Sequence, residues 1–199
     1  MQVFGFFDGK LPYPLVLFYF MSILLLPIFS LLLSYDCISK EVHKETIRNL
    51  VIAAKRNSIV LGKFLGIVII NIAVNFLIYL IAVFYIYQRT KQNLLAEGFL
   101  LWIFLSIYAL YFVALAVMAS ALTSNPQKSL YLSLTFYSLP LLFFTSSKIA
   151  WLSPYNYYVN GFYLLTNSLD KVIPPLMILA LCAVVFIIFA LLVFQRRDL

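Results

Sequence analysis

The sequence contains little charge. Asp, Glu, Lys and Arg together make up 11% of its 199 residues, hydrophobic residues make up 64%, and the mean hydropathy is +1.02. Soluble domains average about 25% charged residues, so this composition excludes a soluble protein and predicts an integral membrane protein. The apolar runs are long and continuous, whereas the strands of a membrane barrel alternate in hydropathy over about ten residues. The sequence therefore predicts membrane-spanning helices.

The sequence also lacks the residue patterns of a catalytic or metal site. Cys37 and Cys182 have no partner at disulfide or metal-ligand spacing, and His43 is the one histidine of the chain. The Gly62–Lys63 pair is followed by Phe64 and lacks the earlier glycine of a phosphate-binding loop. A membrane enzyme acting on lipid would need clustered acids, histidine or a nucleophile. We therefore expect no catalytic residue, no metal and no cofactor bound by this chain.

Five apolar segments are long enough to span a bilayer as helices, which takes about 20 residues. They comprise residues 13–34, 64–87, 98–122, 128–146 and 173–194. We expect residues 1–199 to form a single all-α membrane domain with about five transmembrane helices. No ionisable residue lies deep within any of these segments. This argues against a proton- or ion-coupled carrier, because such carriers need a buried acid or base.

Residues 35–63 form one of the few long charged stretches and must face water, because charge at this density is excluded from hydrocarbon. Six Lys or Arg stand against three Asp or Glu here, and this excess favours the cytoplasmic side. Apolar residues at helical spacing predict an amphipathic helix over residues 36–54, with this apolar stripe: Ile38, Val42, Ile47, Leu50, Val51 and Ala54. Ser34 or Asp36 can cap its N-terminus.

The charged side chains of this amphipathic helix can pair with one another. At i,i+3 spacing, Glu41 can pair with Lys44, and Glu45 can pair with Arg48. The helix can lie along the membrane or against a partner protein. The plain alternative is a solvated loop that sets the topology of the chain and does nothing else.

Basic residues also predict the orientation of the chain. With residues 35–63 inside the cell, nine Lys or Arg lie inside and five outside, which agrees with the positive-inside rule. The N-terminus is then outside and the C-terminus inside. We expect four basic residues to anchor the domain at the cytoplasmic headgroups: Arg56, Lys63, Arg196 and Arg197. Topology and contact with anionic lipid account for the net charge of +7, and no nucleic-acid partner is expected.

Segment 147–172 precedes the last predicted span and is rich in aromatic residues. Trp and Tyr concentrate at the level of the lipid headgroups. We expect one or two short interfacial or re-entrant helices on the outer face, with these aromatic residues at headgroup level: Trp151, Tyr155, Tyr157, Tyr158 and Tyr163. An ordinary aromatic loop is the alternative.

Two predicted spans, the second and the fourth, carry rows of polar residues at i,i+4 spacing. The rows are Asn71, Asn75 and Tyr79, and Ser129, Ser133 and Tyr137. Polar groups in hydrocarbon must face protein or a cavity. Hydrogen bonding between helices is one interpretation, and the lining of a substrate path is the other. Gly62 and Gly66 form a small-xxx-small pair, which predicts close helix packing.

Several short motifs follow one another along the chain. The charged block reads S-x-D-x-I-S-x-E-x-x-x-x-T-I-x-x-L from Ser34 to Leu50, then R-x-x-I-V-L-G-K-F-L-G from Arg56 to Gly66. Further on come A-S-A-L-T-S-N-P-Q-K-S-L from Ala119, an S-P-Y-N segment before the last span, and a terminal R-R-D-L. In order and spacing this series resembles the type-2 ABC exporter permeases over nearly the whole chain.

The resemblance implies a transmembrane permease subunit of an ATP-binding-cassette exporter, located in the plasma membrane of a prokaryote and forming the translocation path. In that family the first cytoplasmic loop carries a coupling helix that docks on a separate ATPase subunit. Carried over to this chain, the resemblance assigns the coupling contacts to Glu41, Lys44, Thr46 and Arg48. ATP and Mg would bind to the partner subunit, so this chain would not be an enzyme. A second permease subunit, identical or different, would complete the path.

The chain departs from the family pattern in three places. Family members usually have Gly where this chain has Glu45, and they often have Pro where it has Ala53 or Ala54, so this turn is expected to be more helical here. They also usually have six spans, and the missing one is the first. A separate small chain can supply it, or the chain is a shortened or true five-span form. The alternative function is a non-transporting assembly or sensory subunit with a basic cytoplasmic docking helix.

Overall fold

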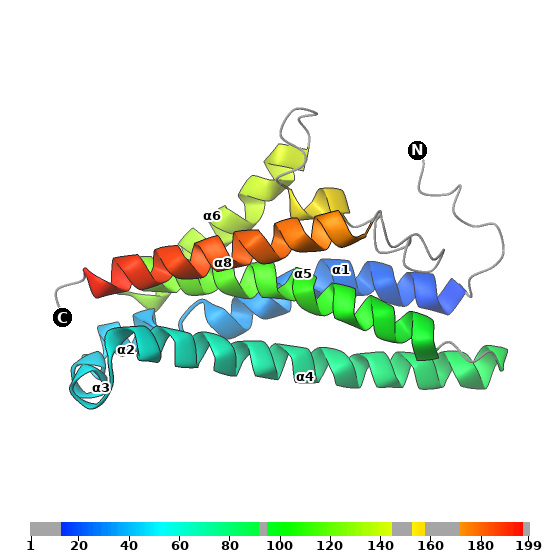
Figure 1. Ribbon diagram of the computed structural model, residues 1–199, viewed down its shortest axis with the longest axis horizontal. Coiled ribbons are helices and arrows are strands. Elements are labelled where there is room, and N and C mark those ends of the chain that lie inside the picture. The colour runs from blue at the N-terminus through cyan, green and yellow to red at the C-terminus, as the bar shows by residue number, and fades with distance from the viewer. Residues whose placement is uncertain (1–12, 92–94, 145–152, 158–171, 197–199) are drawn as a thin grey trace.

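The computed structural model describes residues 13–91, 95–144, 153–157 and 172–196. Figure 1 shows their helices, which are α1 (Tyr13–Ser34), α2 (Ser39–His43), α3 (Ile47–Ala53), α4 (Arg56–Thr90), α5 (Leu95–Leu122), α6 (Pro126–Phe144), the 3-10 helix η3 (Pro154–Tyr157) and α8 (Ile173–Gln195). The bounds of α1 are those predicted. The ends of α5, α6 and α8 lie within three residues of the predicted ones.

Among the described residues, four segments are long and apolar enough to cross a bilayer. They are Leu17–His43, Arg56–Arg89, Gly98–Leu122 and Ile173–Gln195. The chain is therefore an all-α, multi-pass membrane protein, as its composition predicts. α6 does not belong to this group, but residues 145–146 of the predicted fifth span lie outside the described residues, so that span stays a prediction. Polar residues of its first turn, Gln127 and Lys128, lower its hydropathy, and the helix leans away from the long axis of the bundle (Figure 1).

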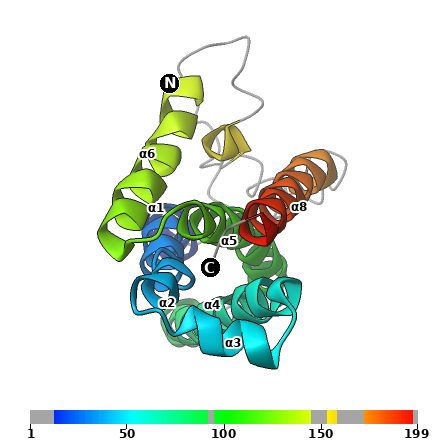
Figure 2. The ribbon, with the colours of Figure 1, turned by 90° about the vertical axis from the view of Figure 1, so that its left-hand side faces the viewer.

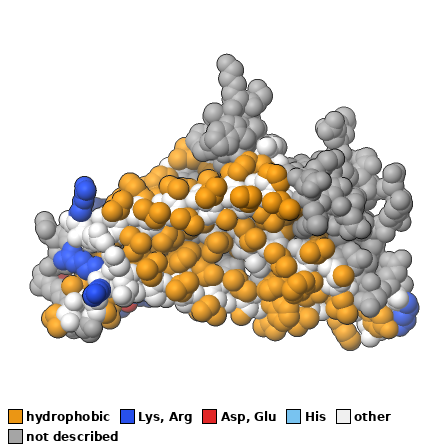
Figure 3. Space-filling view, in the orientation of Figure 1, with side chains coloured by type: hydrophobic (Ala, Val, Ile, Leu, Met, Phe, Trp, Pro, Cys, Tyr) orange, Lys and Arg blue, Asp and Glu red, His pale blue; other side chains and the backbone are white. Residues whose placement is uncertain are grey.

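α5 lies at the centre of the bundle. It packs against α1, α4, α6 and α8, and Figures 1 and 2 show these helices around it. Every residue from Tyr111 to Ala121 is buried. Small side chains in this stretch let the neighbouring backbones come close; they are Ala114, Ala116, Ala119, Ser120 and Ala121. The outer helices instead expose large apolar side chains, which form a belt between two ends that carry basic residues (Figure 3).

α4 is the longest helix and begins earlier than predicted. It starts at Arg56 rather than near residue 64, and its 35 residues correspond to a length of about 52 Å. The hydrocarbon core of a bilayer is about 30 Å thick. The first turns of α4, which belong to the charged block, therefore extend beyond the hydrocarbon. Ala54 and Lys55 are extended and separate α4 from α3, so the chain has a break where the family often has Pro, and the expectation of a more helical turn is wrong.

Gly98 marks a close approach of α5 to α4. A Cβ atom at Gly98 would lie 2.7 Å from Cε2 of Tyr79 and 2.9 Å from Cγ2 of Val83. A Cβ atom at Gly62 or Gly66 would meet no atom within 4 Å in the described part of the chain. The prediction of close helix packing at Gly62 and Gly66 is therefore wrong within this chain, because that face of α4 is open.

Replacing Gly98 with alanine is expected to destabilise the protein by about 1–3 kcal/mol, because the added methyl group overpacks the contact between α4 and α5. Thermal denaturation in detergent measures the effect as a lower Tm. Gly62→Ala and Gly66→Ala are matched controls. They should be neutral or stabilising by up to about 1 kcal/mol, because alanine favours the helix and meets open space. An equal loss of stability in all three variants would contradict this assignment of the close contact.

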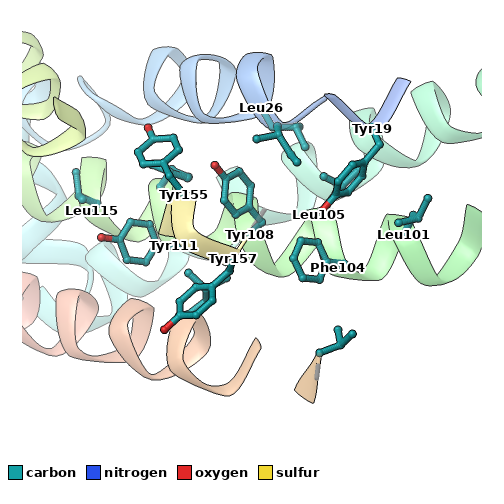
Figure 4. Packing of buried hydrophobic residues seen from close by; sticks show 14 of the residues in the cluster. Tyr19, Leu26, Leu101, Phe104, Leu105, Tyr108, Tyr111, Leu115, Tyr155 and Tyr157 are labelled. Atoms are coloured by element: carbon teal, nitrogen blue, oxygen red, sulfur yellow. The ribbon is translucent and has the colours of Figure 1, made fainter. Parts of the chain in front are cut away.

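η3 brings tyrosines into the core of the bundle. Tyr155 and Tyr157 of η3 are buried in one apolar cluster with Tyr108 and Tyr111 of α5, and Figure 4 shows the four rings beside α5. Ser153, the residue before η3, is attached to α6, because its hydroxyl donates a hydrogen bond to the Pro140 carbonyl at 2.7 Å.

The position of Tyr155 along α5 shows how deep η3 lies. Its ring centroid is 6.0 Å from that of Phe112, which is 14 residues, about 21 Å, from Gly98 at the end of the α5 span opposite the basic residues of α2. The prediction that Tyr155 and Tyr157 sit at headgroup level is therefore wrong, and a re-entrant arrangement fits this part of the segment. Trp151, Tyr158 and Tyr163 lie outside the described residues.

Candidate functional site

Basic residues gather at the end of the bundle formed by α2, α3, the start of α4 and the end of α8, which we call the basic end (Figures 1 and 3). Within the described residues it carries Lys40, Lys44, Lys55, Arg56, Lys63 and Arg196. At the opposite end, where α4 leads to α5, the structure places Arg89 and Lys91. The charge asymmetry predicted from the sequence therefore corresponds to two ends of one bundle.

The predicted single helix over residues 36–54 is divided into α2 and α3. The break falls at Glu45, whose φ of 58° lies in the left-handed region. That conformation costs a residue with a Cβ atom free energy and costs glycine little. Glycine, which the resemblance predicts at this position, would adopt this conformation without that cost.

The apolar stripe of this segment faces the bundle as predicted. Ile38 and Ile47 are buried in a cluster formed with residues of α4, α5 and α8, and Val42, Leu50 and Val51 pack against it. Ala54, the last residue of the predicted stripe, is exposed instead. Each aliphatic side chain contributes about 1.5–3 kcal/mol when it is fully buried. The burial of several of them holds α2 and α3 against the ends of the long helices.

Lys63 of α4 connects its helix to α2. Its Nζ atom lies 2.5 Å from Oε1 of Glu41 and donates a hydrogen bond to the Cys37 carbonyl, also at 2.5 Å. Both side chains are about one quarter exposed, so the ion pair is partly shielded from water. Glu41 therefore pairs with Lys63 rather than with Lys44, because α2 ends at His43 and its Glu41 side faces α4.

Ser120 of α5 caps α2 from another helix. Its Oγ accepts hydrogen bonds from the backbone N–H groups of Ile38 and Ser39, each at 3.0 Å. The predicted caps act elsewhere: the Ser34 hydroxyl donates to the Ser30 carbonyl, and Asp36 pairs with Lys40 at 3.5 Å. Sequence reasoning missed Ser120 because a capping residue so distant in the chain leaves no local pattern.

α6 contacts the segment that leads from α1 into α2 from a third side, and we call this segment, residues 35–41, the linker. The Ser129 hydroxyl donates a hydrogen bond to the Tyr35 carbonyl. Residues 35–41 are therefore fixed by Lys63 of α4, Ser120 of α5 and Ser129 of α6. We call this set of contacts the linker clamp. A displacement of α2 must move these three helices or break the bonds.

The outward side of the α2–α3 segment is exposed. Lys44 and Thr46 are exposed, and the Thr46 hydroxyl donates to the Glu41 carbonyl at 3.3 Å. Arg48 lies in α3, and its side chain is outside the described part of the structure. Ile52 of α3 is 87% exposed, although it belongs to a charged, water-facing segment.

The predicted headgroup anchors have different surroundings. Arg56 donates a hydrogen bond to the Gln195 carbonyl at 3.0 Å, and the Gln195 amide donates to Oδ1 of Asn57 at 2.7 Å. These contacts join the start of α4 to the end of α8. Arg196 is exposed at the same end, Lys63 faces the linker as described above, and Arg197 lies outside the described residues.

The polar row of α4 forms hydrogen bonds between helices. The Asn71 amide donates to the Ser30 hydroxyl of α1 at 2.8 Å, and the Asn75 amide lies 3.5 Å from the Ser106 hydroxyl of α5. The Tyr79 hydroxyl donates to the Leu95 carbonyl at 3.0 Å. The geometry of this row is that of helix packing.

The polar row of α6 also faces protein. Ser129 belongs to the linker clamp, Ser133 is buried with no hydrogen-bond partner for its hydroxyl among the described residues, and the Tyr137 ring lies 5.7 Å from that of Phe112. The side chains of Ser133 and Tyr137 therefore face the core of the bundle. That they line a substrate path stays a prediction.

Replacing Tyr79 with phenylalanine is expected to lower stability by about 0.6–1.7 kcal/mol, because it removes the hydrogen bond to Leu95. Tyr108→Phe is the matched control, because the Tyr108 hydroxyl is buried without a hydrogen-bond partner in the described structure. Removing that hydroxyl should be neutral or stabilising. Denaturation of the two variants in detergent tests the difference, and equal destabilisation would argue against the assigned hydrogen bond.

No group of three His, Cys, Asp or Glu side chains within the described residues could hold a metal ion.

The helices define a multi-pass membrane protein with a structured basic end. A family model described as ABC-2 family transporter protein matches residues 19–199. The chain therefore belongs to the ABC-2 transporter family. It is a membrane subunit of an ABC transporter, a type of subunit that is typically non-catalytic and works with an ABC ATPase subunit. A comparison with curated proteins finds no match.

Proposed function

We propose that this chain is the permease subunit of an exporter and that the α2–α3 segment docks on the ATPase subunit, which binds ATP and Mg. The linker clamp is the observation that supports this proposal. Lys63, Ser120 and Ser129 attach residues 35–41 to three helices of the bundle. A force applied to α2 by a partner would therefore reach the spans directly.

The proposed docking surface is the outward side of this segment. Lys44 and Thr46 are exposed, Ile52 is 87% exposed, and Arg48 lies on α3 between them in sequence. Basic residues provide orientation and a fast association rate with an acidic partner surface, and an exposed isoleucine provides apolar contact area. Glu41 acts in this proposal through its ion pair with Lys63, as a positioning residue.

We propose the following course of coupling. Dimerisation of two ATPase subunits around ATP displaces the docked α2–α3 segment. The linker clamp passes this displacement to α4, α5 and α6, and α5 passes it on to α8, because it packs against both α6 and α8. The relative movement of these helices then opens and closes a path between two permease subunits, identical or different.

The topology of the proposal follows from charge. The basic end lies in the cytoplasm of a prokaryote, at the plasma membrane, because loops rich in Lys and Arg stay inside. The C-terminus of α8 is then inside and the start of α1 outside.

Purification of the tagged chain from its native membrane in mild detergent tests the proposal. The expected result is co-purification of an ATPase with a phosphate-binding loop. Lys44→Glu should reduce its recovery several-fold, and adding Arg48→Glu should reduce it further, because a reversed charge opposes an acidic partner surface. Lys91→Glu is the matched reversal at the opposite end and should leave recovery unchanged.

Two results would count against the proposal. If no ATPase co-purifies under several mild detergents, the non-transporting assembly or sensory subunit becomes the better interpretation. If Lys91→Glu reduces recovery as much as Lys44→Glu, the docking surface is not at the basic end.

A further inference from the structure

An apolar groove of about 520 Å³ lies between α1 and α4, toward the end of the bundle opposite α2 and α3. We call it the α1–α4 groove. Leu17 and Met21 line it from α1, and Ile78, Ala82 and Tyr85 line it from α4. Leu17, Met21, Ile78 and Tyr85 are each between 43% and 52% exposed. The groove therefore opens at the surface of the apolar belt.

A basic residue continues the line of groove residues along α4. Ile78, Ala82, Tyr85 and Arg89 are spaced by four, three and four residues, which places them on one face of the helix. The Arg89 guanidinium carbon lies 5.7 Å from the centre of the Tyr85 ring, which itself lines the groove. The positive charge of Arg89 therefore lies beside one end of the α1–α4 groove.

The dimensions of this face match one leaflet of a bilayer. The eleven-residue step from Ile78 to Arg89 corresponds to about 17 Å along the helix. Half of the hydrocarbon core of a bilayer is about 15 Å thick. An acyl chain in the groove would therefore place its phosphate at the height of Arg89, whose planar guanidinium binds phosphate oxygens in pairs.

We propose that the α1–α4 groove binds an acyl chain of an anionic phospholipid whose phosphate is held by Arg89. The lipid belongs to the leaflet opposite the basic end. This site is independent of the docking surface and of the ATPase subunit, because it requires nothing beyond α1, α4 and a surrounding bilayer.

Native mass spectrometry of the full chain tests the proposal, with phosphatidylglycerol and phosphatidylcholine of identical acyl chains supplied in equal amounts. The wild-type protein should retain phosphatidylglycerol about tenfold more than phosphatidylcholine, because the choline cation of phosphatidylcholine neutralises its phosphate and is repelled by Arg89. Arg89→Gln should remove this preference. Lys91→Gln is the matched loss of charge at the same end and should keep it, because Lys91 lies over Tyr87, outside the groove.

A second pair of variants tests the groove itself. Ala82→Trp fills the groove and should abolish retention of both lipids, whereas Ala73→Trp makes the same change at an exposed position outside the groove and should retain them. Equal retention of the two lipids by the wild type, or equal behaviour within either pair of variants, would overturn the proposal. So would a photoreactive residue at position 82 that cross-links to a polypeptide instead of a lipid, since a protein segment would then occupy the groove.

Discussion

Replacing Lys63 with methionine is expected to reduce recovery of the ATPase subunit about tenfold. The change leaves the Glu41 carboxylate, which is about one quarter exposed, without its cation, and leaves the Cys37 carbonyl without its donor. Breaking a buried ion pair costs about 3–5 kcal/mol, and exposure of this pair to water reduces the cost to about 2 kcal/mol. The docking surface then loses its fixed position. Quantitative co-purification from detergent measures the effect.

Two controls separate this effect from loss of charge. Lys55→Met removes a positive charge from an exposed position of the same loop and should leave recovery within about twofold of wild type. Glu41→Gln combined with Lys63→Met should recover part of the loss, because the uncompensated carboxylate is gone. If Lys55→Met and Lys63→Met behave alike, the ion pair has no role in positioning the segment.

Replacing Ser120 with alanine is expected to weaken the attachment of α2 to the bundle and so to make α2 open more often. The Ser120 hydroxyl accepts from the backbone N–H groups of Ile38 and Ser39, and each buried N–H left without an acceptor costs about 1–3 kcal/mol. A loss of about 2 kcal/mol corresponds to about 30-fold faster amide exchange where opening of α2 limits protection. Hydrogen–deuterium exchange of peptides covering residues 36–43 measures it.

Ser22→Ala is the matched control for this substitution. The Ser22 hydroxyl is also largely buried, but it donates to the Phe18 carbonyl within its own helix. Such a bond to the preceding turn adds little to helix stability, so exchange of residues 36–43 should stay at the wild-type rate. Protection of residues 36–43 that survives in Ser120→Ala would show that the clamp does not depend on this cap.

The long helices could be predicted well from the sequence because their apolar runs are a direct consequence of the bilayer. α1 has the predicted bounds and α8 ends one residue beyond its prediction. The fifth predicted span stays a prediction, because its last residues lie outside the described part of the chain, and Gln127 and Lys128 in the first turn of α6 lower the hydropathy of the described part.

The candidate site could be predicted in outline but not in its contacts. The apolar periodicity of the charged block correctly placed Ile38 and Ile47 against the bundle, because periodicity reports which face is buried. The partners of Glu41 and of α2 depend on residues 22 and 81 or more positions away in the sequence, namely Lys63 and Ser120. Local pairing rules compare neighbours on one helix, so they favoured Lys44 and Ser34 or Asp36 instead.

Site-specific photo-cross-linking in native membranes is the most direct test of the claim that the basic end docks on an ATPase subunit. A photoreactive amino acid replaces Lys44 in one variant and Lys91 in another, both exposed but at opposite ends of α4 and its preceding loop. The account predicts a cross-link from position 44 to a polypeptide with a phosphate-binding loop, and none to that polypeptide from position 91. A cross-link to the ATPase from position 91, with none from position 44, would contradict both the docking surface and the orientation.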